Sequence, residues 1–320
     1  MAGADSAVLE VAGGHLTWTV WDIAADPVAV LDDLPAAQGW LWALYGEAAA
    51  LRAASGEPLG PAVPALPGLA RAARRLAYAH WAARWWPASV IDGIPPLDDR
   101  LLTAEIAELE QECELLSGGE EYGEYGEYGE HGASEEYEDG GAATSPAGTP
   151  PRTDYALAAG PGASGSTRVL ARGTAGTDWR RVPPGLLDAS EQALSWEIVR
   201  SATRRTEVEL SVVAGAGLTD RVPVPAQLLP RATVTAADGS TAQAPLRLTD
   251  DSWTGTAELP GAGPLTFTVH LPAFPDPPTP DDAAQRALRE RVRALARARL
   301  AGVPSDIAPL RAERAAEQEF

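Results

Sequence analysis

The sequence contains no lysine and no asparagine, and all 25 of its Lys+Arg residues are arginine. Lysine and asparagine codons are rich in A and T, so their absence is typical of a protein from a G+C-rich bacterial genome. The same bias enriches alanine, glycine, proline and arginine. The abundance of these four residue types therefore indicates nothing about function by itself.

Cysteine, histidine and long apolar runs are scarce as well. Cys113 is the only cysteine, which excludes an internal disulfide framework and a cysteine-rich zinc site. None of the four histidines has a second histidine or cysteine at metal-ligand spacing. No run approaches the roughly 18 apolar residues that cross a bilayer, and the first residues lack a signal-peptide pattern. We therefore expect a cytoplasmic protein with no metal and no cofactor.

The familiar catalytic motifs are missing too. The sequence has no G-x-S-x-G, no P-loop and no H-E-x-x-H. The "GPGASG" stretch at 160–165 fits G-x-G-x-x-G, but a dinucleotide site needs a strand before the motif and a helix after it. Here a proline lies inside the loop and a β-like run follows, which favours a linker turn.

Negative charge is abundant and unevenly distributed. The net charge is −20, and residues 118–141 hold nine acids and no arginine. A balance of this sign disfavours general binding to nucleic acid or to an anionic membrane. The glycine-spaced "YGEYGEYGE" run cannot keep a helix or bury enough apolar area to offset the entropy of ordering. We interpret residues 118–152 as a disordered acidic linker.

Before this linker, residues 1–117 predict a mainly helical, tryptophan-rich domain with a short N-terminal β-hairpin across Gly13-Gly14. Asp26-Pro27 predicts a short helix, and a helix opened by Pro35 should end near Ser55. Two longer helices should follow, at about 69–86 and from Asp98 onward. The second has a coiled-coil-like apolar seam. It is rich in acids and the first helix is rich in arginine, and these opposite charges favour antiparallel packing of the two. The seam residues are Leu102, Ile106, Leu109, Cys113 and Leu116.

After the linker, residues 153–276 predict an all-β domain. Alternating runs such as "TEVELSVV" are separated by turn residues such as Asp238-Gly239. Seven or eight short strands at this spacing favour an immunoglobulin-like sandwich. "DRVPVP" is one of the expected strands. The predicted fold class is therefore α+β and multidomain.

Residues 277–320 form the last part: a proline-rich bridge, an arginine-rich amphipathic helix at about 281–300, and a loose tail. The helix carries six arginines and three acids. It could bind nucleic acid, a protein partner or the acidic linker. The acidity of the whole chain favours a protein partner.

Three sets of residues are candidate partner-binding sites, and each has a simpler structural interpretation. An aromatic–cationic patch on the 69–86 helix could grip a peptide or could close a small core. The tyrosines of the acidic run could be bound by an arginine-rich surface or could belong to a solvated spacer. The arginines of the C-terminal helix form the third set. The residues are His80, Trp81, Arg84 and Trp85; Tyr122, Tyr125 and Tyr128; and Arg289, Arg293 and Arg297.

The sequence predicts a non-catalytic adaptor or scaffold that binds protein partners in a bacterial assembly or signalling system. Two recognition units joined by a linker gain effective concentration for paired binding. An enzyme with an unrecognised site at Asp92, Asp98 or His80 is one alternative, although capping explains Asp98 and Asp99. A nucleic-acid-associated regulator acting through the arginine-rich helix is the other. No small-molecule ligand is indicated.

Overall fold

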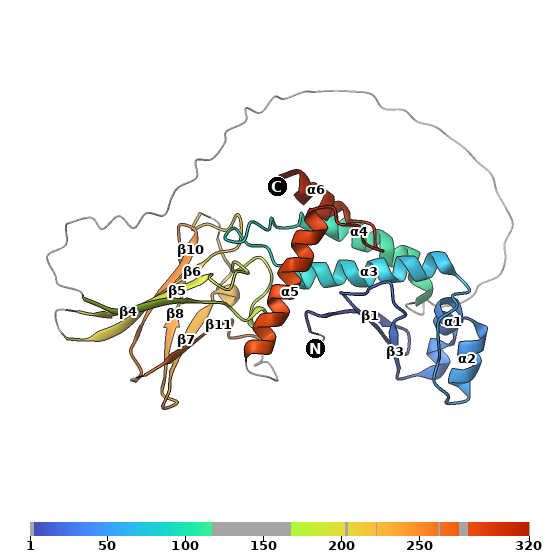
Figure 1. Cartoon of the computed structure of the whole chain (residues 1–320), viewed down its shortest axis with the longest axis horizontal. Coiled ribbons are helices and arrows are strands. Elements are labelled where there is room, and N and C mark those ends of the chain that lie inside the picture. The colour runs from blue at the N-terminus through green and yellow to red at the C-terminus, as the bar shows by residue number, and fades with distance from the viewer. Residues whose placement is uncertain are drawn as a thin grey trace, which may run out of the picture. The chain divides into compact units, whose positions relative to one another are not determined.

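The computed structural model describes residues 3–116, 168–201, 204–221, 223–261, 263–274 and 281–319. Residues 1–119 and 166–320 form one compact unit. The fold is α+β: a small sheet and a helical region come first, antiparallel sheets follow, and the chain ends in helices (Figure 1). The predicted linker at 118–152, with Tyr122, Tyr125 and Tyr128, lies outside the described residues.

The N-terminal hairpin is confirmed, and it is part of a three-stranded antiparallel sheet in the order β1-β2-β3. The short helix predicted at Asp26-Pro27 is wrong, because this segment forms the edge strand β3. Val28 and Val30 of β3 alternate with less exposed neighbours, which is a strand period rather than a helical one. The strands are β1 (Ser6–Val11), β2 (Gly14–Thr19) and β3 (Val28–Leu31).

The helix predicted between Pro35 and Ser55 is two helices, α1 (Leu34–Tyr45) and α2 (Glu47–Ala54). Gly46 separates them with φ of +86°, a conformation that side chains with a Cβ rarely adopt. A Cβ at Gly46 would also lie 2.4 Å from the carbonyl oxygen of Val63. The break therefore depends on glycine, and the chain passes close to the break on its return.

The two longer helices are confirmed as α3 (Pro67–Trp85) and α4 (Asp99–Glu112). Pro67 is in the first turn of α3, and α3 ends before Pro87, which cannot continue a helix. The Asp98 side chain caps α4 by accepting hydrogen bonds from the backbone N–H groups of Arg100 and Leu101. Along the predicted seam Leu102, Leu109, Cys113 and Leu116 are buried and Ile106 is partly buried. The helices pack side by side (Figure 1).

The second half of the chain contains two antiparallel sheets. The first has five strands in the order β4-β5-β6-β10-β9, and the second has three in the order β11-β7-β8. The "DRVPVP" strand is wrong: this segment, which contains Pro223 and Pro225, has no strand among its described residues. The strands are β4 (Arg168–Ala175), β5 (Leu194–Arg200), β6 (Thr206–Val213), β7 (Arg231–Ala236), β8 (Thr241–Pro245), β9 (Arg247–Thr249), β10 (Ser252–Glu258) and β11 (Leu265–His270).

The two sheets share one hydrophobic core. In β6 the alternate residues Val208, Leu210 and Val212 are buried, as their period of two predicts. Trp253 of β10 is fully buried, and its indole N–H donates to the carbonyl of Leu186 at 3.0 Å. Across the core, Trp196 of the five-stranded sheet stacks on Phe267 of β11 with ring centroids 5.2 Å apart.

Two helices end the chain, α5 (Ala283–Leu300) and α6 (Arg311–Glu319). The first confirms the predicted arginine-rich helix, and its N-cap is Asp282. The loose tail is wrong, because residues 311–319 are helical. Leu310 and Ala312 are fully buried and explain why this segment is ordered.

The beginning, middle and end of the chain contribute to one core. Trp179, Val292 and Leu310 belong to the same buried cluster as the side chains of β1, β2, α1, α3 and α4. The division into parts at 1–117, 153–276 and 277–320 stays a prediction about independent folding. The contacts nevertheless show that the first part is packed against residues of the other two.

Candidate functional site

The predicted aromatic–cationic patch on α3 faces the protein interior. Trp81 and Trp85 are buried, and the Trp81 indole donates to the carbonyl of Ala4 at 2.8 Å. The Arg84 guanidinium lies over the Trp85 ring at 4.2 Å and donates to the carbonyl of Trp179 at 3.0 Å. The predicted cation–π contact therefore exists, and its partners are residues of this chain.

His80 is a partly exposed member of this patch. Its Nε2 lies 3.7 Å from a carboxylate oxygen of Glu110 on α4. Partial burial lowers the pKa of His80, and the nearby Glu110 carboxylate opposes that effect only in part. The neutral imidazole is therefore favoured at this position.

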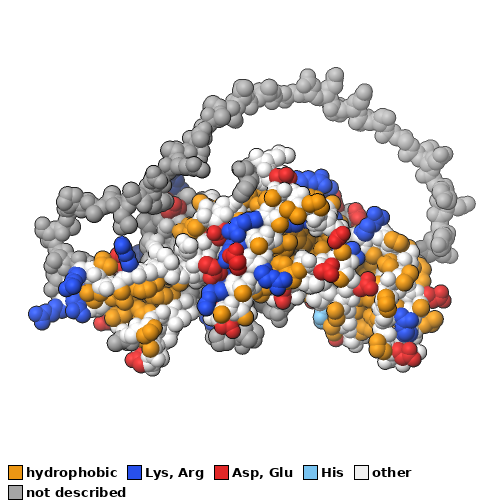
Figure 2. Space-filling model, in the orientation of Figure 1, with side chains coloured by type: hydrophobic (Ala, Val, Ile, Leu, Met, Phe, Trp, Pro, Cys, Tyr) orange, Lys and Arg blue, Asp and Glu red, His pale blue; other side chains and the backbone are white. Residues whose placement is uncertain are grey.

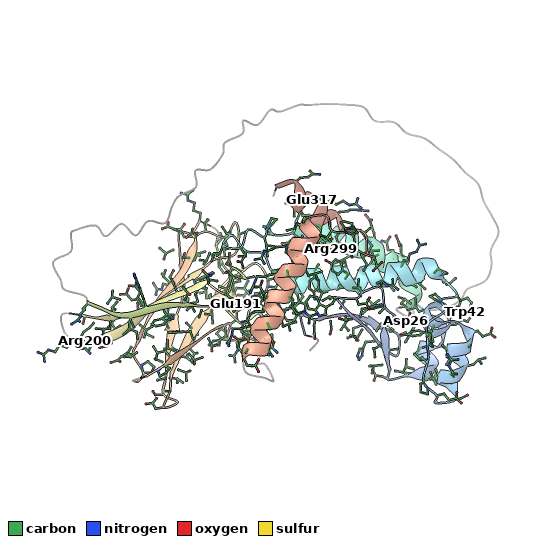
Figure 3. The ribbon with its side chains drawn as sticks, viewed as in Figure 1. Asp26, Trp42, Glu191, Arg200, Arg299 and Glu317 are labelled. Atoms are coloured by element: carbon green, nitrogen blue, oxygen red, sulfur yellow. The ribbon has the colours of Figure 1, made fainter. Side chains whose placement is uncertain are left out.

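The arginines predicted for partner binding lie in an ion-pair network along α5. Arg289 is buried and pairs with Glu191 at 2.6 Å and with Asp281 at 2.7 Å. Arg293 is buried, pairs with Glu290 at 2.7 Å and donates to the carbonyl of Ala189 at 3.1 Å. Figure 2 shows acidic and basic side chains gathered over α5, and Figure 3 marks Glu191 beside it.

Arg297 is partly exposed and lies at the border of the same network. Its guanidinium is 3.4 Å from Asp92 and 3.6 Å from Glu290. Asp92 also faces Arg293 at 3.6 Å. Of the residues considered for an unrecognised enzyme site, Asp92 thus belongs to this network and Asp98 caps α4, and the structure does not bring them together with His80.

Glu191 shows how these charges are balanced. Burial by itself raises the pKa of this carboxyl, but the hydrogen bonds and charge of Arg289, followed by those of Arg293, outweigh burial and lower the pKa. The loop at 176–193 that carries Glu191 is also fixed by Asp188. This buried carboxylate accepts from the Ser89 hydroxyl at 2.7 Å and from the N–H groups of Val90 and Ser190.

A second buried charge cluster was missed from the sequence. Glu313 of α6 accepts hydrogen bonds from the Arg299 guanidinium, the Tyr78 hydroxyl and the Leu310 N–H. Burial and then the neighbouring Glu313 carboxylate raise the pKa of Tyr78. The cluster joins α3, α5 and α6. No local pattern reveals it, because Tyr78 and Glu313 are separated by 235 positions.

A cleft of about 590 Å³ lies where the end of β4, strand β11 and the start of α5 meet. Leu265, Phe267 and part of β4 provide apolar and backbone surface. Charged residues of the loop and of α5 provide the remaining wall. The lining residues are Thr174, Ala175, Gly176, Asp178, Arg181, Glu191, Leu265, Thr266, Phe267, Thr268, Asp281 and Arg286.

Within this cleft, β11 presents a strand edge. It pairs with β7 alone among the described strands. The N–H of Leu271, just after β11, donates away from β7 to the carbonyl of Arg181 at 3.1 Å. Backbone groups reverse direction at each residue of a strand, so those of Leu265, Phe267 and Val269 point the same way as Leu271. These three residues therefore direct their N–H and C=O groups toward the free edge.

Arg286 is the exposed cation of the cleft. It lies one turn before Arg289 on α5, and its side chain lines the cleft. Within the described part of the chain, no carboxylate pairs with its guanidinium. The cleft thus combines an open strand edge with a cation that can pair with an incoming acid. Sequence reasoning placed Arg286 on the helix but did not separate it from the buried arginines.

A second exposed surface lies at the end of α1. The side chain of Trp42 is 45% exposed, and those of Val63 and Leu66 are also exposed. The N–H groups of Val63 and Leu66 donate to the carbonyls of Tyr45 and Ala43, which places both residues beside the last turn of α1. Large exposed apolar side chains that gather in this way are typical of contact surfaces.

The comparisons with known proteins found no match: no family model, no curated protein and no solved structure is significantly similar to this chain. Among the residues that the structure describes, no group of three or more histidine, cysteine, aspartate or glutamate side chains is placed to hold a metal ion. None of the described helices has the length and apolar character needed to span a membrane.

Proposed function

We propose that the protein is a non-catalytic adaptor that binds protein partners through the cleft beside β11. The observation that supports this proposal is that the open edge of β11 and the exposed Arg286 both line a cleft of about 590 Å³. Directional backbone groups and an exposed cation are suited to polypeptide recognition. We propose that such an adaptor acts in a bacterial assembly or signalling system, and the composition typical of a G+C-rich bacterial genome supports this.

The finer fold proposal is that the two antiparallel sheets form an immunoglobulin-like sandwich. Their shared core, with Trp196 stacked on Phe267 between the sheets, supports it. In such an arrangement the edge strands are held rigidly by the core. The surface around Trp42 gives the adaptor a second contact area, which an adaptor requires.

Site-specific photo-crosslinking in cells that naturally express the chain tests the proposal. The crosslinking residue replaces Thr266, which is exposed and lines the cleft. The matched control replaces Thr256, an exposed threonine of β10 that does not line this cleft. We expect a discrete crosslinked protein from position 266 and none of the same mass from position 256.

Charge reversal at Arg286 sharpens this test. Arg286→Glu should reduce the crosslink from position 266 by about tenfold, because an attraction becomes a repulsion. Arg247→Glu makes the same change on exposed β9 and should leave the yield unchanged. An absence of crosslinks from position 266, or equal losses in both variants, would contradict binding in the cleft.

A further inference from the structure

We infer that the partner of this cleft is an extended peptide segment that adds to the second sheet as a strand beside β11 and carries an acidic side chain for Arg286. The inference rests on the proposed function and specifies the chemistry of its partner. It would extend the sheet order β11-β7-β8 by one strand at the β11 end.

The backbone of β11 pairs with β7 on one edge and leaves the other edge without a strand among the described residues. Thr266, Thr268 and His270 lie opposite Thr235, Thr233 and Arg231 of β7. The N–H of Ala236 donates to Ser240 in the β7–β8 turn, so Ala236 and its alternate neighbours point toward β8. The backbone N–H and C=O groups of residues 231, 233 and 235 therefore point toward β11. They form hydrogen bonds with one edge of β11 and leave its other edge unpaired by β7.

The edge of β11 is also held rigidly. Val269 is buried, and Phe267 is fixed by its stack on Trp196. On the same edge, the N–H of Leu271 already donates to the carbonyl of Arg181, which lies outside the sheet. The edge is thus ordered before a partner binds, which lowers the entropic cost of strand addition. Leu265, Phe267 and Val269 provide the free groups, and a strand pairing with them would be about five to six residues long.

The side chains of the cleft specify the partner further. Alternate residues of an added strand point to opposite faces, so one set would contact the side of Leu265 and Phe267 and the other the side of Thr266 and Thr268. The nearby carboxylates of Asp178 and Glu191 already pair with Arg180 and Arg289. Arg286 is then the cation available to an acidic residue of the partner, in keeping with charge complementarity.

Selection of peptides against the full chain tests this inference. The probe is a displayed library of random twelve-residue peptides. We expect the selected sequences to alternate apolar and polar residues and to share an acidic position. Replacing that acid by its amide should weaken binding to the native chain about fivefold and leave binding to the Arg286→Gln protein unchanged.

Amide hydrogen exchange on the complex provides the most specific readout. Strand addition should slow exchange at Leu265, Phe267 and Val269 and leave Thr266, Thr268 and His270 unchanged, because the latter three already face β7. N-methylation of the peptide provides the matched control. At the residues facing β11 it should weaken binding about tenfold, and at their immediate neighbours it should have little effect.

Two results would overturn strand addition: the selection yields no peptide that binds the cleft, or the bound peptide protects none of the three edge amides. Neither result decides the adaptor proposal. A crosslinked partner from position 266 that is sensitive to Arg286→Glu would still support binding in the cleft by a folded surface. Failure of the crosslinking and of the selection together would remove both.

Discussion

Four arginines of α5 fall into two groups with opposite surroundings. Arg289, Arg293 and Arg299 are buried and hold carboxylates of other segments, whereas Arg286 is exposed beside an open strand edge. All of them lie on one helix. The charge of a segment therefore does not identify its binding surface. What matters is which cations the fold has already paired.

The buried group should be essential for folding and the exposed one dispensable. The largest effect should come from the removal of α5 and α6 by ending the chain at residue 280. The helical region would lose Val292, Leu300, Ile307 and Leu310, all buried. At about 1.5–3 kcal/mol for each, the loss approaches the whole stability of a typical domain. We expect the near-ultraviolet circular dichroism of the N-terminal tryptophans to collapse. Retention of a cooperative urea transition with native tryptophan signals would show that the rest of the chain folds without α5 and α6.

Removing a single buried carboxylate should have the next largest effect. Glu313→Gln takes the countercharge from Arg299 and an acceptor from Tyr78 (Figure 3 labels Arg299). We expect the free energy of unfolding to fall by about 3–5 kcal/mol, because an unpaired guanidinium remains buried. Urea denaturation measures the change. Glu317→Gln on the exposed face of α6 is the control and should stay within about 0.5 kcal/mol of the native chain.

The hydrogen bonds of Asp188 join the Ser89 turn to the 176–193 loop, and their loss should have the third largest effect on stability. Asp188→Asn replaces an acceptor of three short hydrogen bonds by an amide whose N–H₂ group faces other donors. We expect the free energy of unfolding to fall by about 2–3 kcal/mol, measured by the same urea denaturation. Asp250 is exposed with φ of +55°, a conformation that asparagine tolerates. Asp250→Asn should therefore be neutral, and equal losses in both proteins would argue against a special role for Asp188.

Acid titration should reveal the smaller contribution of Glu191. Its pKa is lowered in the folded chain, so its stabilisation is present above the ordinary glutamate value of 4.5 and is lost as the pH falls through the folded pKa. We expect the native chain to be more stable than Glu191→Gln at neutral pH. The difference in the free energy of unfolding between the two proteins should narrow below pH 4.5. Unfolding titrations at several pH values measure it, with Glu209→Gln on the exposed face of β6 as control. A gap independent of pH would contradict the ion-pair assignment.

The sequence predicted the parts of this fold that depend on local physics. The period of α4, the proline at the end of α3, the Asp98 cap and the alternation in β6 each act within a few residues. These features gave the helices and most strands. The break at Gly46 was missed because a single glycine inside a helical pattern is compatible with continuation.

The candidate site depends on longer-range features and was largely beyond prediction. Arg289 and Glu191 are 98 positions apart, so nothing local separates a buried arginine from an exposed one. The free edge of β11 follows from sheet order, which the strand patterns alone do not specify. Val292 is buried on the inner face of α5, as expected for an amphipathic helix, but the carboxylates of Asp92 and Glu191 that pair with Arg293 come from other segments.

The central claim is that binding at the cleft is separable from folding along α5. The most direct measurement determines, on one preparation of Arg286→Glu, the free energy of unfolding and the crosslink yield from position 266. We expect a free energy of unfolding within about 0.5 kcal/mol of the native chain and a roughly tenfold loss of crosslinking. A destabilised protein, or an undiminished crosslink, would contradict it.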